Sequence, residues 1–248
     1  MCLLNFYPEE TYTEILSGQV GVSMQPILFS LTLWSFLRAQ FGDCGVVPLA
    51  LSPPAGSANV ESCKICGGWK PPRAHHSRRL NRCVFRMDHV CNWINNVVGY
   101  GNQKFFVLFL FYAFLSCVFN LVVCSIYLWY KLHSEGFGSW DALITASVII
   151  HAVLAFVVKD FLSEQIESIE SNVTLLETFQ NCHGDDSVDV FRQIFGPNPL
   201  LWLIPLHTTA PPDYNETVVA ARRLSTVDAD SLGVELTSKV ESCLDTID

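Results

Sequence analysis

The most informative stretch of this sequence is residues 63–99, which read CKICGGWKPPRAHHSRRLNRCVFRMDHVCNWINNVVG. Its first half carries three cysteines and one histidine in the pattern Cys-x2-Cys-x9-His-x6-Cys, namely Cys63, Cys66, His76 and Cys83. Three thiolates and one imidazole are able to close a tetrahedral structural zinc site. The loop between them is rich in Gly, Pro and Arg and has little capacity for an apolar core. Metal coordination, worth about 10–16 kcal/mol in small zinc modules, is therefore the expected source of its order.

Two other interpretations of this cluster stay open from spacing alone. The four residues can be ordinary buried cysteines with a chance histidine, or part of a nucleic-acid zinc finger, since the block is basic. The second is disfavoured because the block lies between apolar segments and its basic residues have another explanation, given below. Ten cysteines would indicate disulfides in a secreted protein, but the clustering beside a histidine favours metal binding and thiol chemistry in a reducing compartment.

A second pattern follows in the same stretch, Asp88-His89-Val90-Cys91. A thiol attacks a thioester only as the thiolate, so it needs a base or cation nearby to lower its pKa from about 8.5. His89 can supply that base, and Asp88 can orient and charge-stabilise the imidazole as in a catalytic triad. A surface turn or a metal site can contain the same tetrapeptide. Its position, just after the metal cluster and just before a long apolar segment, is what favours a nucleophilic Cys91.

Three apolar segments flank this block and indicate a membrane protein. Residues 105–130 carry no charge over 26 positions, enough at about 1.5 Å per residue to cross a hydrocarbon core of roughly 30 Å. We also predict transmembrane helices over 142–162, whose first 17 residues are uncharged, and over 20–37, which is short and contains Pro26. His151 lies midway along one of them, and we expect it to pack against a neighbouring helix; a functional intramembrane group is the alternative.

The distribution of charge predicts the topology. Residues 38–104 carry nine Lys/Arg and three acidic residues, whereas residues 163–248 carry four and fifteen. Short basic loops resist translocation, so the first of these regions is expected in the cytoplasm. An acidic tail poor in aromatics is typical of disorder, and the Asn-x-Thr match at Asn215 should stay unglycosylated there. The predicted order is a lumenal segment 1–19, a transmembrane helix 20–37, a cytoplasmic domain 38–104, a transmembrane helix 105–130, a lumenal loop 131–141, a transmembrane helix 142–162, a cytoplasmic region 163–206 and a disordered tail 207–248.

These motifs together resemble the DHHC family of zinc-finger palmitoyltransferases. Besides the cysteines and histidine, the resemblance rests on Lys70-Pro-Pro-Arg-Ala-His-His76, Asn81-Arg-Cys83, Met87-Asp-His-Val-Cys91, Trp93-Ile-Asn-Asn96 and Val98-Gly99. Flanking motifs agree with it: Asp43-Cys-Gly45, Asn172-Val-Thr174-Leu-Leu-Glu177, and Phe195-Gly196 through Trp202 and Pro205. The run that begins Asn102-Gln-Lys-Phe-Phe is similar to the Golgi-type branch of the family.

The resemblance implies a membrane all-α fold with a cytoplasmic, zinc-stapled cysteine-rich domain inserted between spans. The family has four transmembrane helices where three are predicted here, so residues 1–4 resemble the stub of a missing first helix. The family also folds around two zinc ions. The first site maps onto the ligands Cys63, Cys66, His76 and Cys83, whereas the four ligands of the second site fall on Ser77, Leu80, Val90 and Val97. We therefore expect one structural zinc ion, with the second site lost and DHVC in place of DHHC.

The activity that the resemblance implies is protein S-palmitoylation. Cys91 takes a fatty acyl group from palmitoyl-CoA, with His89 as base and Asp88 orienting it, and passes the group to cysteines of membrane-associated proteins. Ser116 lies where the family's chain-length gate is expected, and its small size predicts tolerance of longer acyl chains. Candidates for binding the CoA phosphates are Arg73, Arg78, Arg79 and Arg82, although a role as topology signals explains them equally well.

Two further functions compete with this interpretation. The main alternative is a catalytically inactive membrane adaptor or scaffold, whose zinc knuckle binds partner proteins without acyl transfer. The intact set Asp88, His89 and Cys91 favours the enzyme. A transporter based on His151 lacks any charge pathway in the predicted spans. For the enzyme we expect an endomembrane location, Golgi or ER, with acyl-CoA, the bilayer and cysteine-containing proteins as partners and no nucleic acid.

Overall fold

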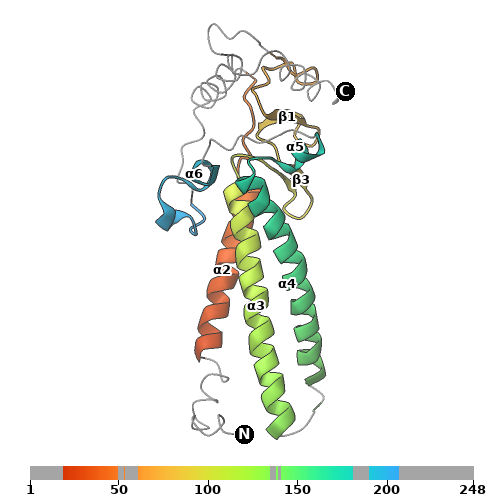
Figure 1. Cartoon of the computed structure of the whole chain (residues 1–248), viewed down its shortest axis with the longest axis vertical. Helices are drawn as coiled ribbons and strands as arrows, with labels where there is room; N and C mark the ends of the chain where they lie inside the picture. Colours follow the sequence, from red (N-terminus) through yellow and green to blue (C-terminus); the bar gives the residue numbers. More distant parts are fainter. Residues whose placement is uncertain are drawn as a thin grey trace. The chain divides into compact units, whose positions relative to one another are not determined.

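A computed structural model describes residues 19–49, 53, 61–134, 138, 141–180 and 190–206 (Figure 1). The chain divides into two compact units, one of residues 1–35 and 107–164 and the other of residues 36–106 and 165–248. Most of the predicted lumenal segment 1–19, the whole of the predicted tail 207–248 and Asn215 lie outside the described residues.

Long helices make up the first unit. They are α2 (Gln19–Phe41), α3 (Gln103–Ser134) and α4 (Asp141–Glu170), each of which continues at one end into the second unit. Gln25 Nε2 of α2 donates to Ser116 Oγ of α3 at 2.8 Å. Cys124 Sγ of α3 lies 3.9 Å from Ser147 Oγ of α4. Polar contacts of this kind hold helices together in lipid, where the hydrophobic effect does not drive apolar helices toward one another.

Two of these helices have the properties of membrane spans. Within the described part of the chain, α3 over Gln103–His133 and α4 over Asp141–Glu170 are long and apolar enough to cross a membrane. Only 28% and 11% of their most apolar stretches are buried within the protein, whereas the core helix of a soluble protein is mostly buried. Helix α2 covers the predicted segment 20–37, and its passage through a membrane stays a prediction.

The helices differ from the predicted segments mainly in length. Hydropathy marks only the part of a helix that is apolar, whereas the backbone hydrogen bonds continue as far as the next residues allow. Helix α4 thus runs past Lys159 and Asp160 to Glu170. His151 Nδ1 lies 2.8 Å from the carbonyl oxygen of Ser147, one turn earlier on the same helix, and the packing of its ring against a neighbouring helix stays a prediction.

The second unit contains two short antiparallel hairpins, which the all-α prediction missed. Strand β1 (Ala74–Ser77) pairs with β2 (Arg82–Phe85), and β3 (His89–Cys91) pairs with β4 (Asn96–Val98). Strands of three or four residues are too short for an alternating pattern to be recognised. Each hairpin loop ends on an asparagine with positive φ, 51° at Asn81 and 53° at Asn95, a left-handed conformation that asparagine tolerates better than most residues.

Buried side chains under the hairpins form two clusters. One contains Val47, Cys63, Ala74, Cys83 and Phe85. The other contains Cys44, Val84, Met87 and Val97, with Val46 and Leu80 packed against it. Asp43 Oδ1 accepts the N–H groups of Gly45 and Val46 and so fixes a turn. Cys44 and Val47 of this turn belong to the two different clusters. Gly101 packs so closely on this turn that a Cβ there would lie 2.4 Å from the Asp43 carbonyl oxygen.

The second hairpin caps the end of α2. Asn96 Nδ2 lies within hydrogen-bonding distance of the carbonyl oxygens of Ala39, Gln40 and Gly42, at 3.0 to 3.1 Å. Asn102 Nδ2 donates to Ala39 and also to Val97 of β4. The last carbonyls of a helix have no partner within it, so these amides satisfy groups that would otherwise be left open. The unit is completed by α5 (Leu175–Phe179), α6 (Val190–Phe195) and the 3-10 helix η1 (Pro199–Leu201).

Candidate functional site

Hairpin register and a tight turn bring the four predicted metal ligands together. Cys63 and Cys66 lie on a turn in which Gly67 N–H donates to the Cys63 carbonyl at 2.8 Å. His76 and Cys83 are directly paired across β1 and β2. The ligand atoms of all four residues lie within 4.8 Å of one another.

The distances within this cluster fit zinc. Tetrahedral zinc, with bonds of about 2.3 Å to sulfur and 2.0–2.1 Å to nitrogen, holds two sulfurs about 3.8 Å apart and a sulfur and a nitrogen about 3.6 Å apart. Cys66 Sγ and Cys83 Sγ are separated by 3.8 Å, and Cys63 Sγ and His76 Nδ1 by 3.5 Å. In donor chemistry and in spacing, the cluster could therefore hold a metal ion.

Strand β3 presents the second predicted group. Side chains alternate along a strand, so His89 and Cys91 lie on one face and Val90 on the other. The Cys91 thiol is buried and interacts with the His89 imidazole, while Val90 is 43% exposed. His89 Nδ1 lies 2.8 Å from Asp88 Oδ2, and the His89 ring packs edge-on against Phe106 with centroids 5.4 Å apart. The His89 imidazole therefore interacts with the Asp88 carboxylate on one side and with the Cys91 thiol on the other.

Asp88 is held by groups from far along the chain. Gln165 Nε2 donates to Asp88 Oδ2 at 2.9 Å, and the Leu175 N–H donates to Asp88 Oδ1 at 2.7 Å. The carboxylate is 1% exposed, so these bonds replace water around it. Sequence analysis missed both donors. The match at Asn172–Glu177 marked this region, but nothing in the sequence indicated that a backbone N–H there faces Asp88.

The electrostatics of the site favour a thiolate paired with an imidazolium. Burial lowers the pKa of His89, but hydrogen bonding to Asp88 and Cys91 outweighs burial and raises the pKa to about 9. Burial raises the pKa of Cys91, but the His89 imidazole and the backbone N–H groups of Ile94 and Trp93 bring it below its ordinary value. The pKa of Asp88 is likewise lowered, because its bonds to His89, Leu175 and Gln165 overcome burial.

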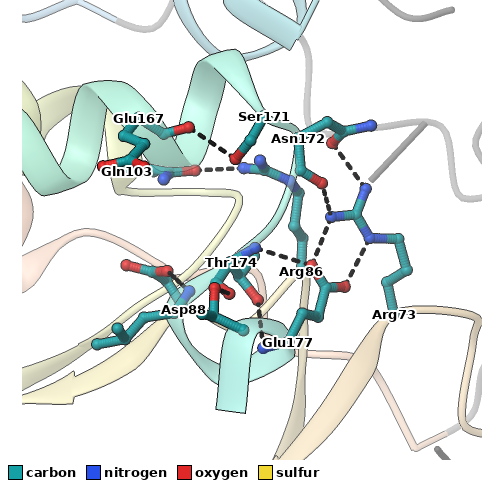
Figure 2. A network of polar contacts seen from close by, with 11 residues as sticks. Arg73, Arg86, Asp88, Gln103, Glu167, Ser171, Asn172, Thr174 and Glu177 are labelled. Atoms are coloured by element: carbon teal, nitrogen blue, oxygen red, sulfur yellow. Dashed lines mark hydrogen bonds and ion pairs between the residues drawn. The ribbon is translucent and has the colours of Figure 1, made fainter. Parts of the chain in front are cut away.

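A short helix carries one of the two donors to Asp88 and is itself tied to the first hairpin. Thr174 and Glu177 form a capping box at the start of α5, which fixes the turn that carries the Leu175 N–H. Arg73 Nε and Nη2 donate to the two oxygens of Glu177, both at 2.7 Å. The same guanidinium donates to the side-chain and backbone oxygens of Asn172 at 2.8 Å (Figure 2). Bidentate pairing of this kind is stronger than a single charged hydrogen bond.

A buried arginine links the same region to the start of α3. Arg86 is 3% exposed, and its Nη1 donates to Gln103 Oε1 (Figure 2). Burial lowers the pKa of Arg86 to about 10, while the carboxylates of Glu177 and Asp88 oppose that shift. Two arginines therefore stabilise the surroundings of Asp88. Arg73 pairs with Glu177, and Arg86 interacts with the carboxylates of Glu177 and Asp88.

The other predicted residues lie as follows. Among the candidates for binding CoA, Arg73 has its donors engaged internally, Arg79 donates to Asn95, Arg82 donates to the Asn81 carbonyl, and Arg78 is exposed. Ser116 accepts the bond from Gln25 described above.

A serine and three aliphatic residues occupy the four positions onto which the second zinc site of the family maps. Leu80 and Val97 belong to the apolar cluster around Val84. Ser77 is buried, and its Oγ has no hydrogen-bond partner among the described residues. Val90 is paired with Val97 across β3 and β4.

An acid, an imidazole and a thiol thus lie beside a cysteine–histidine cluster that could hold a metal ion, and comparison with known proteins identifies the family. The model of the DHHC palmitoyltransferase family matches residues 57–182, just over half of the chain. Probable protein S-acyltransferase 12 of Arabidopsis thaliana is 33% identical over 211 residues, covering 73% of this chain and 71% of the relative. Probable protein S-acyltransferase 15, also from Arabidopsis thaliana, is 29% identical over 79% of this chain and 87% of its own length. Palmitoyltransferase ZDHHC15 of Xenopus laevis is 33% identical over 62% of this chain and 49% of its own length.

This chain therefore belongs to the DHHC palmitoyltransferase family.

Proposed function

We propose that this protein is a protein S-acyltransferase that moves a fatty acyl group from acyl-CoA, through an acyl-Cys91 intermediate, to cysteines of membrane-associated proteins. The observation that carries the proposal is the continuous contact from Asp88 through His89 to Cys91, with His89 and Cys91 on one face of β3. The names of the S-acyltransferase and palmitoyltransferase relatives support it.

In the first step the Cys91 thiolate attacks the thioester. A bond forms between Cys91 Sγ and the acyl carbonyl carbon, and the bond from that carbon to the CoA sulfur breaks. The His89 imidazolium gives its proton to the leaving CoA sulfur, so CoA departs as a thiol and the imidazole becomes neutral. Asp88 stabilises the imidazolium before the step and orients the ring during it.

In the second step the neutral His89 takes a proton from the thiol of a substrate cysteine. The substrate sulfur bonds to the acyl carbon, and the bond from that carbon to Cys91 Sγ breaks. Cys91 returns as a thiolate beside an imidazolium, which is the starting state. The protons and bonds of the cycle therefore balance with Cys91, His89, the acyl-CoA thioester and the thiol of the substrate cysteine.

The decisive experiment incubates the purified full chain with radiolabelled palmitoyl-CoA. We expect a label on the protein that neutral hydroxylamine removes, because hydroxylamine cleaves thioesters. The label should be absent from Cys91→Ala and retained in the matched control Cys117→Ala, which removes a cysteine from α3 instead. Well-folded, metal-loaded protein that takes up no label would exclude the enzyme and favour the adaptor.

The metal cluster is proposed to hold one structural zinc ion on Cys63, Cys66, His76 and Cys83. Its distances match tetrahedral zinc, as set out above, and zinc there would fix the first hairpin. The second zinc site of the family is proposed to be lost. Apolar packing of Leu80 and Val97 supports this, since burial of an aliphatic side chain stabilises by about 1.5–3 kcal/mol and partly offsets the missing metal.

The binding of the donor and the location of the enzyme are also proposals. Arg78, Arg79 and Arg82 are the better candidates for the CoA phosphates, because the Arg73 guanidinium is already paired with Glu177. The acyl chain is proposed to lie among the helices near Ser116. A Golgi or ER membrane, with residues 38–104 facing the cytoplasm, is supported by the basic charge of that region and by the Golgi-type run after Asn102.

A further inference from the structure

The C-terminal end of the described chain exposes an apolar surface. No charged residue occurs from Gln193 to Leu206. Within this segment Leu200 is 85% exposed, Leu203 56% and Leu206 46%. We refer to these three side chains as the Leu200 surface. Several exposed leucines in one short segment without charge are unfavourable in water and are typical of a surface that meets another apolar phase.

The exposure results from a defined local structure. Trp202 packs against Phe191 and Phe195, with ring centroids 6.1 Å and 5.8 Å apart. The Trp202 indole N–H donates to the Gly196 carbonyl at 2.8 Å, and Asn198 Oδ1 accepts the Leu200 N–H at the start of η1. The aromatic rings take the inner side of the segment. The leucines of the Leu200 surface are therefore left on its outer side.

A single lysine ties this segment to the start of α3. Lys104 Nζ donates to the carbonyl oxygens of Leu201 and Leu206, both at 3.0 Å, and lies 3.4 Å from that of Phe195. Lys104 lies in the first turn of α3, immediately before the uncharged run 105–130. Lys104 is only 4% exposed, so protein carbonyls rather than water surround its ammonium. The bonds hold the segment at the residue where the apolar run of a candidate membrane span begins, and the ends of such a run lie at the polar boundary of a bilayer.

We propose that the Leu200 surface inserts into the headgroup–acyl boundary of the bilayer and that Lys104 holds it there. The bilayer is favoured over a protein partner because the segment is tied to the first turn of a helix with the composition of a membrane span. An uncharged leucine surface also offers no group that would select one protein from another. Such a contact is the interfacial type of membrane binding, distinct from a span.

Photo-crosslinking tests the proposal on the full chain in phosphatidylcholine vesicles that contain a radiolabelled phosphatidylcholine. Benzoyl-phenylalanine replaces Leu200 in one variant and Ile65 in a matched control. Ile65 is also an exposed apolar residue of this unit, 63% accessible, but lies in the turn of the metal cluster. We expect a lipid adduct at position 200 and none at position 65. Absence of an adduct at 200, equal adducts at both positions, or a cross-link from 200 to a second protein chain would each overturn the proposal.

The role of Lys104 has its own measurement. Lys104→Met keeps the length of the side chain and removes the ammonium, so the lipid adduct at position 200 should fall toward the level at position 65. An unchanged yield would overturn Lys104 as the anchor. Hydroxylamine-sensitive labelling of Cys91 is measured in the same samples. A lipid adduct without acyl label refutes the proposed activity alone, and acyl label without a lipid adduct refutes the membrane contact alone.

Discussion

The position of the Cys91 thiol beside the His89 imidazole depends on the alternation of side chains along β3, a strand of three residues. His89 and Cys91 share a face of β3, and Val90 between them faces the other way. A change at position 90 therefore alters the opposite face without removing either reacting group. This explains how the chain can carry valine in the middle of the motif and keep acid, imidazole and thiol in contact.

Removal of the His89 imidazole tests its role in acid–base catalysis of Cys91 acylation. His89→Ala should lower the rate of Cys91 acylation by about 10²–10⁴-fold, the usual contribution of general acid–base catalysis. His133→Ala is the control, because His133 is exposed at the end of α3 and its Nδ1 lies 2.7 Å from the Trp129 carbonyl oxygen of the same helix. The measurement is the initial rate of hydroxylamine-sensitive labelling. Equal rates for both variants would show that His89 does not activate the thiol.

The charge of Asp88 should set the pH at which Cys91 reacts. Asp88→Asn keeps the size of the side chain and an acceptor for the Leu175 N–H but removes the charge that raises the pKa of His89 to about 9. With less imidazolium beside it, the pKa of Cys91 rises toward the ordinary thiol value of about 8.5. The pH midpoint of iodoacetamide alkylation at Cys91, read by peptide mass spectrometry, should therefore move upward. Asp160→Asn, an exposed change on α4, should leave the midpoint in place, and an unshifted Asp88→Asn midpoint contradicts the mechanism.

Among the elements, α5 joins two segments that are far away in the sequence, because it contacts both Asp88 and Arg73. Its capping box fixes the turn from which the Leu175 N–H reaches Asp88. The Arg73 guanidinium fixes the helix through Glu177. The stability of this short helix is thus coupled to the ionisation of Asp88, a proposed member of the catalytic group.

Glu177→Gln should destabilise the second unit. Glutamine still fits a capping box but loses the charged bonds to Arg73, which contribute about 1.5–3 kcal/mol. The pKa of Glu177 is lowered, because bonds to Arg73 and to the Thr174 N–H overcome burial. This stabilisation is therefore present above the unfolded pKa of about 4.3 and is lost as pH falls through the lower folded pKa.

The measurement is thermal unfolding in detergent, followed by Trp fluorescence as a function of pH. The Glu177→Gln variant should melt at lower temperature than the parent at neutral pH and converge with it in acid. Glu164→Gln, an exposed change on α4, should melt like the parent throughout. A Glu177→Gln variant as stable as the parent at neutral pH would show that the Arg73 pair does not hold α5.

The cysteine–histidine cluster at the first hairpin predicts the number of zinc ions bound per chain. About one zinc ion per chain is expected by atomic absorption, since one complete tetrahedral donor set is present among the described residues. His76→Ala should lose that zinc. His75→Ala is a matched control, because the neighbouring histidine points to the other face of β1 and is not in the cluster. Two zinc ions per chain would show that the second site has not been lost.

For the whole molecule, the two apolar helices predict a topology. Helices α3 and α4 are joined by residues 135–140, so a chain that crosses the membrane twice brings residues 38–104 and 163–206 to the same side. An epitope tag inserted after Gly138 should be inaccessible to antibody when only the plasma membrane is permeabilised. A tag at the C-terminus should be accessible under the same conditions. Accessibility of both tags would exclude the predicted arrangement of α3 and α4.

The long helices could be predicted from sequence because a hydrophobic run signals a membrane span without reference to any distant residue. The metal cluster and the Asp88-His89-x-Cys91 group could be predicted for a related reason, since their members lie close together in sequence. The two hairpins escaped prediction. Their strands are too short to show a period, and they are recognised only from the pairing of Ala74–Ser77 with Arg82–Phe85 and of His89–Cys91 with Asn96–Val98.

Sequence alone thus predicted the candidate reacting groups, the cysteine–histidine cluster beside them and the apolar helices α3 and α4. Tertiary structure alone decided what surrounds Asp88: Gln165 lies 77 positions away and Leu175 lies 87. The same holds for the pairing of Arg73 with Glu177, 104 positions apart. Local contacts follow from backbone geometry, whereas a hydrogen bond between distant segments exists only after the chain has folded. The ionisation of the acid, and with it the reactivity of the thiol, is therefore a property of the fold.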